Sequence, residues 1–356
     1  MVDRPPPERA LPAGLDHVAA RVEARVNRLL DAEQERWEAL DPTLADPIEA
    51  LRSLVLAGGK RLRPAFVHWG WVAGGGDPQA SPPVDAGAAF EVLQGFALTH
   101  DDIMDGSAVR RGAPTVHRSF IARHDRSGWA GEPRRFGEGA AILVGDLALV
   151  YADLLFPTGS ADLAAHWHEL RVELNMGQYL DLLGTATRRI DRAHARRTAR
   201  YKSGRYTIER PLQVGALLAG AGDLAESLAG YGGPLGEAFQ LRDDVLGVFG
   251  DPGRTGKPVG DDLREGKPTV LLALAHERAD EAQRTVLGEV GDPDLDPTAI
   301  ERIQQVLVDT GALDRVEASI EALWAEAEDA LAPLALAGGA GDALRDLARF
   351  VVARDA

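Results

Sequence analysis

Three carboxylates stand close together in the segment THDDIMDGSAVRRGAPT, residues 99–115. On a helix, Asp101 and Asp105 are one turn apart and share a face, with Asp102 beside them. Like charges at this spacing repel, and the apolar residues before them predict a surrounding of low dielectric constant. Either a bound cation compensates the charges, or the helix end is solvated. Carboxylates with no cysteine and no dedicated histidine set favour Mg²⁺ over Zn²⁺ as that cation.

A second acidic pair, Asp243 and Asp244, lies in FQLRDDVLGVFGDPGRTGKPVGDDLREGKPT, which also contains Asp262. Two helical acidic motifs far apart in sequence, each followed by basic residues, predict two facing walls of one cavity. A polyanion held through metals would fit between them, and a diphosphate suits this description. The GRTGKP piece lacks the spacing of a nucleotide-binding P-loop, and Pro258 stands where Ser or Thr is needed.

Lysine is rare among the basic residues of the chain, and each lysine stands near these acidic motifs or in a similar motif. Only four of the 39 basic residues are lysines: Lys60, Lys202, Lys257 and Lys267. Each lysine lies in a motif flanked by glycine or acidic residues, which indicates a need for a compact ammonium group instead of a planar guanidinium. The arginines in the same motifs are Arg61, Arg63, Arg110, Arg111 and Arg205.

Helical periodicity runs through nearly the whole chain, and no run of alternating apolar and polar residues predicts a strand. The Pro-rich residues 1–14 are predicted to be a disordered tail, and residues 15–356 to form one all-α domain. Residues 82–105 are predicted to form a central, mostly buried helix after Ser81. Residues 122–139, rich in Gly, Arg and Glu, are predicted to form a mobile loop.

The composition excludes several classes of protein. A net charge of −16 opposes nonspecific nucleic-acid binding, which needs a positive surface. The absence of cysteine excludes disulfides, thiolate nucleophiles and zinc–thiolate sites. No segment is apolar enough to predict a membrane span or a signal peptide, so a cytoplasmic location is expected.

The motifs together resemble the trans-isoprenyl diphosphate synthases, also called the polyprenyl synthetase family. They occur in the family's order, as GGKRLRP, DDIMD with RRG, LVGD, MGQYLDL, YKSGRY, FQLRDD and GKPVGDDLREGKPT. The resemblance implies a large helical bundle with a deep central cavity, a homodimer, and Mg²⁺ with three ions per active site. It also implies condensation of isopentenyl diphosphate with an allylic diphosphate (dimethylallyl, geranyl or farnesyl), releasing diphosphate.

The resemblance also implies roles for individual residues. Metal ligands would be Asp101, Asp105 and Asp243, assisted by Asp102, Asp244 and Asp262. The isopentenyl diphosphate clamp would comprise Lys60, Arg63 and Arg111, with Gln94 where many relatives carry His. Contacts to the allylic diphosphate would come from Arg110, Lys202 and Lys257. Ser203 and Gln240 would stabilise the allylic cation, and Lys267 closes the second motif. The residues expected to act in catalysis are Asp101, Asp102, Asp105, Arg110, Lys202, Gln240, Asp243, Asp244 and Lys257.

Two positions bear on the details of the reaction. Gly247 departs from the family pattern, because this position of the second motif is often a third Asp. Relatives making twenty-carbon chains often carry an aromatic residue five before the first motif, and Phe96 stands at that position, five residues before Asp101. Ala97 lies on the carboxylate face. Geranylgeranyl diphosphate is therefore the expected product, with farnesyl or a longer diphosphate as the alternative.

Two other functions are the alternatives to prenyl transfer. A class I terpene cyclase also ionises allylic diphosphates, but cyclases generally lack the GGKRLRP and RRG clusters present here. A non-catalytic regulatory subunit tends to lose one acidic motif, and both are present. Gln178 and Asp181, one turn apart, are candidates for a polar layer in the cavity.

Overall fold

The structure is a computed structural model that describes residues 14–250 and 260–353. Residues 1–13 of the predicted tail, Lys257 and Pro258 therefore lie outside the described residues. The first helices are α1 (Leu15–Glu38), η1 (Pro42–Leu44), α2 (Ala45–Leu56), α3 (Leu62–Ala73), α4 (Pro82–Met104), α5 (Val116–Ser127) and α6 (Pro133–Leu155). They are followed by α7 (Ala161–Thr187), α8 (Arg192–Ala199), η2 (Arg200–Glu209), α9 (Arg210–Leu218), α10 (Gly222–Ser227) and α11 (Ala229–Phe249). The last are α13 (Asp261–Glu265), α14 (Val270–Arg278), α15 (Glu281–Leu287), α16 (Pro297–Asp309), α17 (Ala312–Leu331) and α18 (Ala340–Val352).

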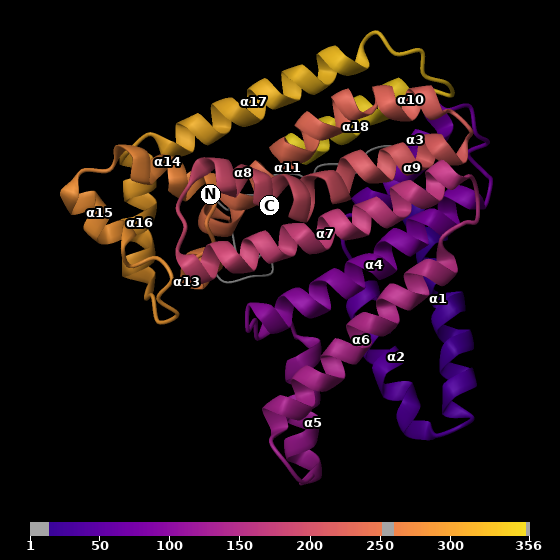
Figure 1. Ribbon diagram of the computed structural model, residues 1–356, viewed down its shortest axis with the longest axis horizontal. Helices are drawn as coiled ribbons and strands as arrows, with labels where there is room; N and C mark the ends of the chain where they lie inside the picture. Colours follow the sequence, from indigo (N-terminus) through magenta and orange to yellow (C-terminus); the bar gives the residue numbers. More distant parts are fainter. Residues whose placement is uncertain (1–13, 251–259, 354–356) are drawn as a thin grey trace, which may run out of the picture.

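The all-α prediction is confirmed, and long helices dominate the molecule (Figure 1). The predicted central helix is α4, which begins directly after Ser81 and buries most of its residues. The strands in the described ranges are β1 (Val109–Arg110) and β2 (Ala113–Pro114), which form a short antiparallel hairpin. Among the described helices, none is long and apolar enough to cross a bilayer.

The prediction of a mobile loop over residues 122–139 is wrong for most of this segment. Helix α5 continues to Ser127 and α6 begins at Pro133, so that residues 128–132 alone connect them. Gly128, at φ 61°, ends α5 in the left-handed conformation, and Pro133 begins α6. A Cβ atom at Gly137 would lie 2.6 Å from the carbonyl oxygen of His117, so this glycine allows α5 and α6 to approach closely instead of breaking a helix.

Two groups of packed helices hold the acidic motifs. Helix α4, which ends in the first motif, packs against α1, α3 and α6. Helix α11, which carries the second motif, packs against η2 and α17, and η2 in turn packs against α7 (Figure 1). The apolar side chains form two cores, one that includes α4, α6 and α7 and one that includes α11 and α17. Both motifs are therefore carried on helices that are fixed by burial.

The segment η2 is a π-helix, a form that closes i→i+5 hydrogen bonds and often occurs at functional sites. Close contacts at two glycines of the neighbouring helices fix the backbone of η2. A Cβ atom at Gly177 of α7 would lie 2.3 Å from the backbone nitrogen of Lys202, and one at Gly236 of α11 would lie 2.5 Å from the carbonyl oxygen of Gly204. The backbone of η2 is thus in direct contact with the two neighbouring helices, which fixes the position of Lys202 and Ser203.

We expect Gly177→Ala to lower the free energy of unfolding by about 1–3 kcal/mol, because the new methyl group overlaps the backbone of η2. Gly139→Ala in α6 is the matched control, since no atom lies within 4 Å of its Cβ position and alanine favours a helix. Chemical denaturation of both variants measures the difference. Equal free energies of unfolding for the two variants would show that η2 can shift without an energetic cost.

Candidate active site

Two adjoining cavities lie between the acidic motifs, with volumes of about 320 Å³ and about 150 Å³. The residues that line both of them are Asp101, Lys202, Ser203, Gln240 and Asp243. Other predicted site residues that line one of the two are Arg63, Gln94, Ala97, Arg110, Asp244, Asp262 and Lys267. The structure therefore brings α4 and α11 to the same cavity, as the sequence predicts for its two acidic motifs.

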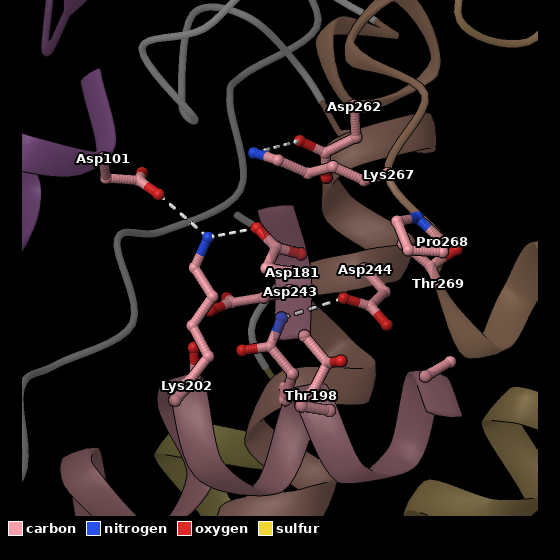
Figure 2. A pocket seen from close by; sticks show the side chains of 14 residues that line it. Asp101, Asp181, Thr198, Lys202, Asp243, Asp244, Asp262, Lys267, Pro268 and Thr269 are labelled. Carbon is pink, nitrogen blue, oxygen red and sulfur yellow. Dashed lines mark hydrogen bonds and ion pairs between the residues drawn. The ribbon is translucent and has the colours of Figure 1, made fainter. Parts of the chain in front are cut away.

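Lys202 connects the first acidic motif to α7 across the cavity (Figure 2). Its Nζ donates to Oδ1 of Asp101 at 2.8 Å and to Oδ2 of Asp181 at 2.5 Å. Gln178 also donates to Asp101 Oδ1, at 3.0 Å. Burial raises the pKa of Asp101, but the ammonium groups of Lys202 and Lys267 outweigh it and hold this pKa well below its usual range. Gln178 and Asp181 thus belong to the polar layer of the cavity.

Lys267 forms a second ammonium-centred cluster. Its Nζ lies 2.5 Å from Glu265, 3.3 Å from Asp105 and 3.6 Å from Asp262. Burial raises the pKa of Asp105 to about 6, with Lys267 opposing the rise and the charge of Asp101 adding to it. The pKa values of Asp101 and Asp105 therefore shift in opposite directions although both residues lie on one face of α4, because the ammonium groups outweigh burial at Asp101 and do not outweigh it at Asp105.

The two carboxylates of the second acidic motif differ in burial. Asp243 is half-buried and lines both cavities. Asp244 is buried, lines the smaller cavity and accepts a hydrogen bond from Gln240 Nε2 at 2.8 Å. Burial raises the pKa of Asp244 to about 8; the bond from Gln240 opposes the rise, and the charges of Asp262 and Asp243 add to it. Without a cation, Asp244 therefore keeps its proton at neutral pH.

The β1–β2 hairpin directs the side chains of the two arginines of the RRG motif to different parts of the structure. Its turn residues Arg111 and Gly112 both have positive φ, at 53° and 75°, as a two-residue hairpin turn requires. Arg110 points to α4, where Nε donates to Asp102 at 2.8 Å and a terminal nitrogen lies 3.3 Å from Asp101. Arg111 instead donates to the carbonyl oxygen of Gly58. The hairpin thus connects the first acidic motif with GGKRLRP.

The basic residues of GGKRLRP have different surroundings. Arg61 has φ 47° and is buried against Glu23 and Glu91, so it anchors this segment to α1 and α4. Arg63 lines the larger cavity, donates to Thr207 Oγ1 at 2.8 Å and stacks over the Tyr206 ring at 4.4 Å. The ammonium of Lys60 lies 5.6 Å from the ring centre of Phe350 in α18.

Arg111 adds to this positive region. Burial lowers the pKa of Arg111, and the nearby charge of Arg61 lowers it further against the opposing charge of Glu91. A pKa lowered by neighbouring cations indicates that positive charge is concentrated here, which suits an anionic ligand. Gln94 lines the larger cavity, as Arg63 does.

The two residues expected to set the product length occupy different places. Ala97 lines the larger cavity together with Leu98, Leu174 and Phe239. Phe96 is buried in the core on another face of α4, with its ring 4.8 Å from that of His100. It is not among the residues that line either cavity, so its influence on product length stays a prediction.

A family model named polyprenyl synthetase matches residues 46–309 of the chain. The chain belongs to the polyprenyl synthetase family. This confirms the resemblance drawn from the motifs, and it accounts for their order along the chain.

Several relatives in this family match most of the chain. A geranylfarnesyl diphosphate synthase of Aeropyrum pernix is 34% identical over 288 residues, covering 78% of this chain and 84% of the relative. A geranylgeranyl diphosphate synthase of Mycobacterium tuberculosis is 37% identical over 231 residues, or 63% of this chain and 60% of the relative. A solved geranylgeranyl pyrophosphate synthase of Corynebacterium glutamicum, complexed with isoprenyl diphosphate and magnesium, is 38% identical with a TM-score of 0.90, covering 96% of this chain and 99% of that one.

The side chains of this polyprenyl synthetase suit a magnesium ion. One carboxylate oxygen from each of Asp101, Asp105 and Asp181 can be chosen so that all three lie within 4.8 Å of one another. Such a set of oxygen donors is what Mg²⁺ prefers. The sequence-based ligand set omits Asp181, although its spacing of three from Gln178 in MGQYLD places both side chains on one side of α7.

Proposed function

We propose that this protein is a Mg²⁺-dependent trans-prenyltransferase that condenses isopentenyl diphosphate with allylic diphosphates, and that its main product is geranylgeranyl diphosphate. The observation that carries the proposal is one cavity lined by Asp101 of the first acidic motif, Asp243 of the second, and Lys202 between them. Relatives named geranylgeranyl diphosphate synthase support this product. Farnesyl diphosphate is the alternative, and relatives with that name also match.

The metal part of the proposal assigns ligands on both walls. Asp101, Asp105 and Asp181 would hold Mg²⁺ beside α4, and Asp243 would hold it beside α11, with three ions per site. Bound Mg²⁺ neutralises the diphosphate leaving group and so assists its departure. The proposal leaves Asp102, buried and paired with Arg110, as a residue that positions this guanidinium.

The side chains of the protein bind and orient the two substrates. We assign Lys60, Arg63, Arg111 and Gln94 to isopentenyl diphosphate, and Arg110, Lys202, Lys257 and Lys267 to the allylic diphosphate. The hydroxyl of Ser203 and the amide oxygen of Gln240 line the cavity beside Asp243, where their dipoles would stabilise an allylic cation. Ala97, Leu98, Leu174 and Phe239 provide the apolar surface for the growing chain and exclude water from the cation.

The test is incubation of the pure protein with isopentenyl diphosphate, Mg²⁺ and each allylic primer in turn. Chromatography of the products identifies the chain length, and EDTA removes the metal. We expect a twenty-carbon diphosphate with Mg²⁺ and none with EDTA. Cyclic hydrocarbons would indicate a terpene cyclase, and the absence of any product would indicate a regulatory subunit.

We expect Ala97→Phe to shorten the main product to farnesyl diphosphate, because the ring would occupy part of the cavity of about 320 Å³. Phe96→Ala is expected to lengthen the product by opening space beside Ala97. Product chromatography measures both. If neither variant changes the chain length, the end of the cavity is formed by other residues.

We also propose that the protein is a homodimer, with α6 and α7 forming the interface. Of the seventeen exposed large apolar side chains in the described residues, ten lie on these two helices. They are Phe136, Ile142, Leu143, Val150, Leu154, Val172, Met176, Tyr179, Leu182 and Leu183. Large apolar side chains that are exposed and concentrated on two helices are typical of protein–protein interfaces.

We expect Leu143→Glu combined with Met176→Glu to convert the dimer to a monomer of 38.0 kDa, because two charges would be buried in the interface. Light scattering after gel filtration measures the mass. Val308→Glu is the control, since Val308 is also exposed but lies on α16. A wild-type mass of 38.0 kDa would contradict the proposal.

A further inference from the structure

Arginines are concentrated in the turn between α7 and α8 and along α8 itself. Residues 188–200 read RRIDRAHARRTAR, and with histidine neutral this segment has a net charge of +5, whereas the whole chain has a net charge of −16. All six arginines of the segment are exposed. We call them the arginine patch, which comprises Arg188, Arg189, Arg192, Arg196, Arg197 and Arg200. Positive charge this concentrated in an acidic protein favours a local partner of opposite charge.

The local fold directs the arginine patch to solvent. Arg188 ends α7 with φ 48°, and Asp191 caps α8 by accepting a hydrogen bond from the backbone nitrogen of Ala193 at 2.9 Å. The buried positions of α8 are taken by a histidine and three small residues, which are His194, Ala195, Thr198 and Ala199. With this side α8 packs against α7 and α14 (Figure 1), so the arginines remain on its outer side.

The protein itself balances only half of the arginine patch. Three of the arginines have acidic partners, and these pairs are Arg189–Asp191, Arg192–Glu277 and Arg196–Glu237. No ion pair joins Arg188, Arg197 or Arg200 to a carboxylate of the residues that the structure describes. Three guanidinium groups are therefore available to an external anion.

An apolar side chain lies within the arginine patch. Ile190 directly follows Arg189 in the turn after α7 and is 41% exposed. Ile190 and Arg188 also line a cavity of about 270 Å³, whose other apolar walls are Pro268, Leu272, Leu287 and Val290. A nucleic acid or an acidic protein segment needs only the positive charges. An exposed isoleucine among arginines instead suits a surface in which acidic headgroups cover hydrocarbon.

We infer that the arginine patch and Ile190 bind the surface of a membrane that contains acidic phospholipids. The guanidinium groups contact the headgroup phosphates, and Ile190 enters the boundary between the headgroups and the acyl chains. This interaction goes beyond the proposed function and does not depend on it.

The inferred contact has a consequence for a prenyl transferase, whose product is a lipid. Ala195, Thr198 and Ala199, on the inner side of α8, line the cavity of about 150 Å³. A single helix, about 10 Å across, thus separates the membrane surface from the proposed site of product formation.

The test is cosedimentation of the pure protein with lipid vesicles in the absence of substrates. We expect binding to vesicles of phosphatidylcholine and phosphatidylglycerol in equal parts, and little to phosphatidylcholine alone. The triple variant Arg189→Gln, Arg192→Gln and Arg197→Gln should bind about a hundredfold more weakly, because each arginine near an acidic surface contributes about fivefold. Ile190→Ser is expected to weaken binding about threefold to tenfold. High salt should weaken binding of the wild type, since it screens the charges.

Two control variants match these changes elsewhere on the surface. Arg36→Gln, Arg302→Gln and Arg349→Gln together remove three exposed arginines, from α1, α16 and α18. Val308→Ser replaces an apolar side chain that is 46% exposed on α16. Both controls should bind vesicles like wild type. Every variant should keep the wild-type melting temperature and turnover, because none of the replaced residues lines the two active-site cavities.

Three results would overturn the inference. They are failure of the wild type to bind the mixed vesicles, undiminished binding by the triple arginine variant, and an equal loss of binding in its charge-matched control. Binding to a DNA duplex as tight as to the vesicles, with no effect of Ile190→Ser, would also overturn it and would indicate a soluble polyanion. None of these results contradicts the proposed function, which is tested separately by product formation.

Discussion

Replacing Asp101 with alanine is expected to lower the rate of prenyl transfer by about a thousandfold or more, the size of effect found when a group that stabilises developing charge is removed. Asp101 connects several groups of the site, because Lys202, Gln178 and Arg110 all donate to it. Its loss removes a proposed metal ligand and leaves the buried ammonium of Lys202 with Asp181 as its remaining carboxylate. Steady-state kinetics with saturating Mg²⁺ measures the change.

The control for this variant is Asp342→Ala, because the side chain of Asp342 is 90% exposed and lies in the first turn of α18. It should retain wild-type turnover. Circular dichroism should show the same helix content in both variants, since Asp101 is near the end of α4 and not in its apolar core. Undiminished turnover of Asp101→Ala, or full wild-type activity in EDTA, would contradict the metal-dependent mechanism.

Lys202→Arg is expected to lower kcat/KM by about tenfold to a hundredfold although it keeps the positive charge. The ammonium is held between oxygens of Asp101 and Asp181 at 2.8 and 2.5 Å. A guanidinium is larger and planar, so it cannot take the same position between them. The backbone of Lys202 packs closely against Gly177 of α7, which fixes the point from which the side chain begins.

Arg134→Lys is the reverse substitution and serves as the control, since Arg134 pairs with Glu138 on an exposed turn of α6, outside both cavities. Exposed pairs of this kind contribute little to stability. We expect wild-type kinetics for this variant. The same argument extends to Lys60→Arg, and full activity of both lysine variants would refute the need for ammonium groups.

The helical fold and most of the candidate site could be predicted because they depend on local patterns. The apolar periodicity before Asp101 predicts a buried helix, and α4 is that helix. The family's motifs then bring Lys202 and Asp243 into one cavity, where the structure places them. These features follow from residue types and short spacings, which a single sequence contains.

The features that could not be predicted depend on contacts between distant segments. Glycines in residues 122–139 are typical of a loop, but Gly137 serves the contact of α5 with α6. Arg61 and Arg63 are equivalent in sequence, yet the left-handed backbone of Arg61 turns it to Glu23 and Glu91. A Cβ atom at Gly247 of α11 would meet the carboxylate of Asp262 in α13, a contact that only the packed structure shows.

The glycine contacts on both sides of η2 have a consequence for how this enzyme can be altered. Backbone contacts at Gly177 and Gly236 support the π-helix, while Ser203 and Thr207 direct their side chains to the larger cavity. The backbone of η2 thus provides the packing contacts, and its side chains line the cavity. Stability and substrate preference can therefore be engineered separately here, without the usual trade-off between the two. Variation at Ser203 should change which allylic diphosphate is used while the melting temperature stays constant.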